Sequence, residues 1–106
     1  MANVYSTRFI QHRGLTNSAP ADYVVPAGYR AVVKSIVVYN NDVFQSNLFL
    51  EGAAGQAVAY FERSLGNRSI DQQTPDAVYE ADELIRVRVV AGTWDVTVCG
   101  FLLTLP

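Results

Sequence analysis

Hydrophobic and polar residues alternate with a period of two along most of the chain, which is typical of β-strands. The pattern is strongest in Ala31–Tyr39, where Val or Ile fills five of the nine positions. Leu84–Val90 alternates aliphatic residues with two arginines, which indicates one buried and one solvent-facing side. Trp94–Leu103 is apolar on both faces and is therefore predicted to be a central strand.

Weaker strand patterns fill the intervals between these three segments. They cover Asn3–Gln11, Ala21–Val25, Asn47–Glu51, Ala57–Arg63 and Arg68–Gln73. Residues typical of turns separate the strands, at Pro26-Ala27-Gly28, Asn40-Asn41-Asp42, Gly52–Gly55, Gly66-Asn67 and Ala91-Gly92-Thr93. About eight short strands at this spacing predict an all-β fold, a single antiparallel β-sandwich domain over residues 1–106 with a jelly-roll-like topology.

The inward-facing positions of the predicted strands define an expected core. Its members are Val33, Val37, Ile85, Val87, Val89, Val96, Val98 and Phe101. The only helix-like stretch is Asp76–Leu84, where Pro75 can open a turn, although the Val78-Tyr79 pair fits a strand or a loop equally well.

The N-terminal segment Met1–Arg13 is followed by Leu15–Asp22, a loop rich in small and polar residues. We predict that Met1–Arg13 is an edge strand or an exchangeable arm, which pairs within its own sheet or with the exposed edge of a neighbouring subunit. In the exchanged arrangement Tyr5 and Phe9 contact the neighbour, and both are candidate partner-contact residues.

Composition suggests that the chain associates with other subunits. Only 17% of the 106 residues are charged, against about 25% in a typical soluble protein. Either part of the surface is buried against other subunits, or the surface is covered by neutral Thr, Ser, Asn and Gln. The net charge of −2 has the wrong sign for phosphate neutralisation, so we expect no nucleic-acid partner.

Catalytic and metal-binding patterns are missing from the sequence. A single His and a single Cys do not make a zinc site, and Cys99 lies in an apolar run where a buried, inert thiol is expected. Asp71, Asp76, Glu80, Asp82 and Glu83 form an acidic run without calcium-loop spacing, so a solvated loop is favoured over a calcium site. No phosphate-binding loop or serine-nucleophile motif is found. We therefore predict a protein that is not an enzyme and has no catalytic residue, cofactor or metal.

Segments for targeting or membrane insertion are also missing. No window reaches the length of about 18 apolar residues that a membrane span needs, so we expect no membrane partner. Residues 1–15 lack the apolar stretch of a signal peptide, which favours synthesis in the cytoplasm.

Val43 and Phe44 are the other two candidate partner-contact residues. They follow the turn Asn40-Asn41-Asp42 and precede the polar Gln45-Ser46-Asn47. A phenylalanine at a polar hairpin tip is either exposed for a partner or folded back over the end of the sandwich.

Three stretches of the chain carry a resemblance to known proteins. They are Val4–Phe9, the run Tyr23–Asn40 with its Val25-Pro26-Ala27-Gly28 turn, and the ending Gly92–Leu103 with its Gly100-Phe101-Leu102-Leu103 pattern. In this combination the chain resembles small structural proteins of tailed bacteriophages, such as capsid decoration proteins, head fibres and minor tail proteins. The resemblance implies a β-sandwich virion component that contacts major capsid or tail proteins. It brings no catalytic residues.

This resemblance implies a location and an assembly. We expect a protein made in the host cytoplasm and incorporated into the virion as a homo-oligomer, with a trimer favoured because it matches the three-fold positions of a capsid lattice. The alternative is a carbohydrate-binding receptor module of a phage tail, which would hold sugars through exposed aromatic side chains.

Overall fold

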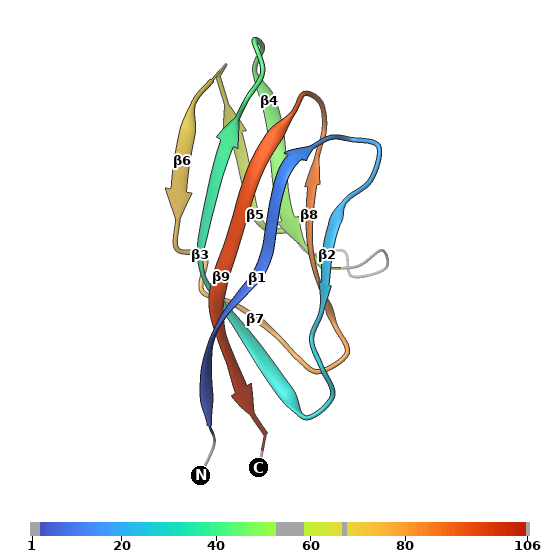
Figure 1. The fold of residues 1–106 in the computed structure, drawn as a ribbon, viewed down its shortest axis with the longest axis vertical. Helices are drawn as coiled ribbons and strands as arrows, with labels where there is room; N and C mark the ends of the chain where they lie inside the picture. The colour runs from blue at the N-terminus through green and yellow to red at the C-terminus, as the bar shows by residue number, and fades with distance from the viewer. Residues whose placement is uncertain (1–2, 53–58, 67, 106) are drawn as a thin grey trace.

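A computed structural model describes residues 3–52, 59–66 and 68–105 of the chain. These residues form nine strands and no helix, which confirms the all-β prediction (Figure 1). The strands are β1 (Val4–Leu15), β2 (Ala21–Val24), β3 (Tyr29–Asn40), β4 (Ser46–Glu51), β5 (Ala59–Leu65), β6 (Ile70–Gln73), β7 (Ala77–Tyr79), β8 (Leu84–Val89) and β9 (Trp94–Thr104).

The strands form two antiparallel sheets that pack as a sandwich. The five-stranded sheet has the order β1-β9-β3-β6, with β7 also paired to β3, and the four-stranded sheet has the order β2-β8-β4-β5. β6 and β7 pair with successive parts of β3, so they act as one interrupted strand. Counted in this way, the two sheets contain eight strands. Their order is that of a jelly roll, so the predicted topology is confirmed.

The apolar core fills the space between the sheets. Trp94 and Tyr79 are its largest fully buried side chains. Six of the residues predicted for the core are buried, namely Val33, Ile85, Val87, Val89, Val96 and Val98. The strands that supply them alternate buried and partly exposed positions, as expected for sheets with one face toward a core.

Val37 and Phe101 were wrongly predicted to be core residues. A β-bulge at Lys34 inserts one extra residue into β3 opposite the junction of Cys99 and Gly100. The inward face of β3 therefore passes from Ala31 and Val33 to Ile36 and Val38, and Val37 turns outward. Phe101 faces outward from β9 and is 37% exposed.

Asp76–Leu84, which the sequence left open between a helical turn, a strand and a loop, begins with β7, which pairs with β3, and contains no helix. Cys99 is half-buried on the outer face of β9 rather than in the core. The predicted strand Ala57–Arg63 appears as β5 from Ala59 onward, while residues 57–58 and the predicted turn at residues 53–55 lie outside the described residues.

β1 is an edge strand of the five-stranded sheet and pairs with β9 of its own chain along its whole length. Bulges interrupt the pairing between Arg8 and Ile10 and between Arg13 and Leu15. The segment from Ile10 to Arg13 is therefore the regular part of β1 between two irregular points.

Four loops gather at the end of the molecule opposite the two chain termini (Figure 1). They connect β1 to β2, β3 to β4, β5 to β6, and β8 to β9. At the other end, Asn3 and Thr104 hold the first and last strands together, since the Asn3 N–H donates to the Thr104 hydroxyl over 2.7 Å.

Candidate interaction surfaces

The loop end, defined here as residues 41–45, 68–69 and 90–93, is held together by main-chain hydrogen bonds between loops. Asn41 N–H donates to Thr93 O over 2.9 Å, and Arg68 N–H donates to Asp42 O over 3.1 Å. A third bond runs from Asn40 N–H to Ser69 O. The loops therefore support one another and do not project separately into solvent.

Asn40 organises the loop between β3 and β4 from inside the protein. It is fully buried; its amide nitrogen donates to Phe44 O over 2.9 Å, and its amide oxygen accepts from Asp42 N–H over 3.1 Å. The Asp42 carboxylate in turn accepts from Val43 N–H. In the loop fixed in this way Val43 is 67% exposed, and Phe44 is 47% exposed with one edge of its ring beside Gly92 of the loop between β8 and β9.

We expect Asn40→Ala to destabilise the protein by about 1–3 kcal/mol, because it removes a buried amide and leaves two partly buried main-chain groups of the loop without partners. Urea denaturation followed by circular dichroism measures the loss. Asn41→Ala is the matched control: Asn41 is exposed and bonds Thr93 through its main chain, so a change within about 0.5 kcal/mol is expected. Equal losses in the two variants would contradict the role given to Asn40.

The other two candidate contact residues lie on β1, apart from the loop end. Tyr5 is 47% exposed near the chain termini, with its ring centroid 6.3 Å from that of Tyr29. Phe9 is only 6% exposed and packs edge-on against Tyr23 at 5.1 Å between centroids. The structure therefore brings Val43 and Phe44 together at one end, leaves Tyr5 at the other, and places Phe9 in the core of its own chain.

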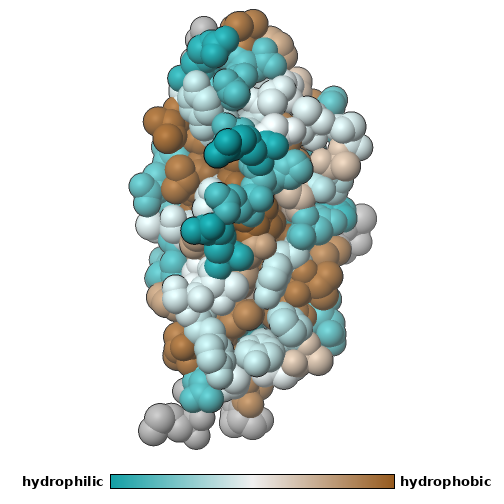
Figure 2. Space-filling model, in the orientation of Figure 1, coloured by the Kyte–Doolittle hydropathy of each residue, from teal (hydrophilic) through white to brown (hydrophobic). Residues whose placement is uncertain are grey.

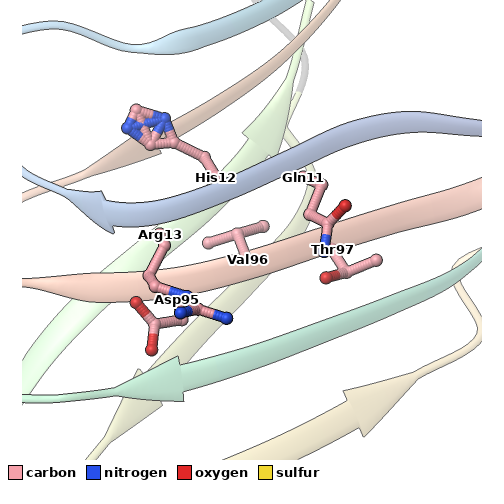
Figure 3. Close-up of a pocket in the computed structure, with 6 residues that line it drawn as sticks. All are labelled: Gln11, His12, Arg13, Asp95, Val96 and Thr97. Atoms are coloured by element: carbon pink, nitrogen blue, oxygen red, sulfur yellow. The ribbon is translucent and has the colours of Figure 1, made fainter.

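Two hollows border β1. One, of about 380 Å³, lies over the paired strands β1 and β9 and is lined by Gln11, His12, Arg13, Asp95, Val96 and Thr97 (Figure 3). The second, of about 310 Å³, lies between β1 and β2 and is lined by Phe9, Ile10, Gln11, His12, Ala21 and Asp22. His12 borders both hollows and projects away from Arg13 and Asp95 in Figure 3. The sequence predicted an edge strand or arm over Met1–Arg13, but it did not indicate these hollows, because nothing in the sequence places β1 beside β9 or β2.

The outer face of the five-stranded sheet mixes apolar and charged side chains. Val4, Val78 and Phe101 are exposed there, beside an ion pair of Arg30 with Glu80 at 3.0 Å and another of Lys34 with Asp76. Figure 2 shows brown apolar patches on this side of the molecule, separated by teal and white polar residues.

The two arginines of β8 make two-pronged contacts with carboxylates on the neighbouring strands β2 and β4. Arg86 donates to both carboxylate oxygens of Asp22, at 2.7 and 2.9 Å, and this hydrogen bonding raises the pKa of Arg86 above its ordinary value. Arg88 bonds Glu51 at 2.8 Å and lies over the Phe49 ring at 4.4 Å. These contacts fix neighbouring strands to one another.

The acidic run does not gather around a common point. Asp76 and Glu80 form the ion pairs described above, and Glu83 accepts a hydrogen bond from Glu80 N–H. Among the described residues, no three metal-ligating side chains come together. The same part of the chain contains no helix long and apolar enough to cross a bilayer.

The comparisons with known proteins reveal similarity of fold. No protein-family model matches the chain, and no curated protein matches its sequence. The NLP core of Drosophila, whose structure is described for pentamer formation and histone binding, matches with a TM-score of 0.57 and 16% identity over 93% of this chain and 96% of that one. The Gx strain structure of infectious bursal disease virus matches with a TM-score of 0.46 and 9% identity, over 99% of this chain and 32% of that one. The Gt strain structure gives 0.34 and 8%, over 96% and 31%. At these identities the NLP core shares a fold with this chain, and the two virus structures are weaker likenesses.

Proposed function

We propose that the protein is a non-enzymatic structural component of a phage virion, either a capsid decoration protein or a minor tail protein, which acts through protein contacts at its loop end. The observation that carries the proposal is the exposure of Val43 and Phe44 on a loop that Asn40 fixes from below. An ordered apolar tip loses little entropy on binding, which favours a docking role.

Two further points support the proposal. Jelly rolls are common in viral capsid proteins and in lectins, and the sequence resembles small virion proteins of tailed phages. Pentamer formation by the NLP core, which has the same fold, supports homo-oligomers in general. For this chain we propose a trimer. The protein is synthesised in the host cytoplasm and incorporated into the virion.

The function is tested by adding the purified protein to phage particles that were made without its gene and measuring how much protein binds. We expect wild-type protein to bind at a regular copy number and Phe44→Ser to lose at least 10-fold in affinity, since a buried interface aromatic contributes well over about 1.4 kcal/mol. Tyr5→Ser is the matched control, because Tyr5 and Phe44 are equally exposed, at 47%, and it should bind like wild type.

The same variants separate the proposal from its rival. Absence of wild-type protein from both capsids and tails overturns the virion role. Binding to a glycan array that Phe44→Ser abolishes, without binding to particles, identifies the carbohydrate-binding module instead.

A further inference from the structure

The free side of β1 is an unoccupied edge of the five-stranded sheet. Among the described residues, only β9 pairs with β1. Between its two bulges, four residues from Ile10 to Arg13 continue the ladder without interruption. The main-chain groups on their free side can pair with one more strand, and the hollow between β1 and β2 leaves room for side chains of that added strand.

The opposite edge of the same sheet is β6, which also has four residues. Ile70–Gln73 pairs with β3 on one side and is the last strand of the sheet order on the other. The two free edges of the sheet therefore offer regular segments of equal length.

The register places these two segments at the same height in the sheet. Four complete rows cross it from β1 to β6, and they are Ile10-Val98-Ile36-Gln73, Gln11-Thr97-Val37-Gln72, His12-Val96-Val38-Asp71 and Arg13-Asp95-Tyr39-Ile70. A second copy placed beside the first, without a shift along the strands, would continue each row.

Strand direction permits the same junction. Every pairing in the sheet is antiparallel, so β1 runs parallel to β3 and antiparallel to β6. When copies are related by rotation about an axis parallel to the strands, β1 of one copy meets β6 of the next in antiparallel orientation. Such a contact uses two different surfaces and closes into a ring if the rotation divides a full turn.

Charge selects this contact over pairing of two identical edges. β1 contains Arg8, His12 and Arg13 and no acidic residue. β6 contains Asp71. Asp76, which follows β6 in the chain, is paired with Lys34. Two β1 edges would face each other with basic side chains, and two β6 edges with Asp71, whereas β1 against β6 places His12 beside Asp71.

We propose that copies of this chain join edge to edge, β1 of one against β6 of the next, and close into a ring. In the junction His12 lies beside Asp71 of the next copy, and Gln11 lies beside its Gln72. The ring deepens the homo-oligomer part of the proposed function and does not depend on the virion role.

A charge exchange tests the ring. The molar mass of the wild-type protein, measured by light scattering at high concentration, should be that of a small ring. The single variants His12→Glu and Asp71→Lys should each have the mass of a monomer. The double variant H12E/D71K should recover the wild-type mass, because the opposite charges are exchanged. Ala27→Glu and Ala27→Lys are the controls, since Ala27 is exposed in the turn between β2 and β3, at the opposite end from the four loops, and both should retain the ring.

Cross-linking gives a second readout that tolerates weak association. Residues facing each other in an antiparallel pair have Cα atoms about 4.5–5.5 Å apart, within the range of about 4.4–6.8 Å for a disulfide. In a Cys99→Ser background, H12C/D71C should give covalent ladders that end at the ring size on mild oxidation, and either single cysteine should not.

The outcomes separate this inference from the virion role. A wild-type monomer that gives no ladder overturns the ring, and so does a dimer that His12→Cys cross-links alone. Failure of H12E/D71K to regain the mass that its parent variants lost also overturns it, provided circular dichroism shows all three folded. A protein that fails these tests and still binds particles keeps the proposed function.

Discussion

Gly100→Ala is expected to abolish stable folding or to lower the free energy of unfolding by more than about 4 kcal/mol, a loss that single substitutions reach only through a definite structural conflict. Gly100 lies on β9 opposite the β3 bulge. A Cβ at this position would lie 1.9 Å from Val32 O and 2.9 Å from Lys34 N, both main-chain atoms that cannot rotate away. The two central strands of the five-stranded sheet would have to separate.

Urea denaturation and the yield of soluble protein measure this effect. Gly66→Ala is the matched control, because its Cβ would meet only Ser69 Oγ, at 3.7 Å. Its stability should stay within about 1 kcal/mol of wild type. A Gly100→Ala variant as stable as this control would show that β3 and β9 do not approach each other as described.

Trp94→Ala is expected to cost about 3–5 kcal/mol, the range for removing a buried aromatic side chain. Trp94 is fully buried at the start of β9, and its indole N–H donates to Ala91 O over 3.0 Å. The side chain thus fills the core and fixes the loop between β8 and β9.

Trp94→Phe separates the two contributions, because it keeps most of the apolar volume and loses the hydrogen bond. We expect a smaller loss of about 1–3 kcal/mol. Circular dichroism follows unfolding in both variants, since they lack the single tryptophan that fluorescence would report. Equal losses would mean that the hydrogen bond, rather than the packing, accounts for the role of Trp94.

Most of the fold could be predicted from alternation and turn residues, and the errors have local causes. The bulge at Lys34 reverses which residues of β3 face inward, and both Ile36 and Val37 are apolar, so the sequence does not mark the reversal. Phe101 belongs to a strand that is apolar on both faces, where alternation says nothing about its direction. β7 has only three residues, too few to show a period.

The surfaces were less predictable, because they depend on strands distant in sequence. The exposure of Val43 and Phe44 follows from their polar neighbours, but the burial of Asn40 does not, since asparagine in a turn is ordinarily at the surface. The match of β1 with β6 depends on the register through β9 and β3, which local sequence does not reveal.

The position of β9 has a consequence for synthesis. It is the last strand of the domain to leave the ribosome, yet it lies between β1 and β3, the earliest long strands. Until β9 emerges, the edges of β1 and β3 that it will pair with remain unpaired. The sheet is then completed by contacts between distant parts of the chain, and topologies of this kind fold slowly. In this interval nascent chains are open to mispairing with one another, because the edges of β1 and β3 that β9 later covers are exposed.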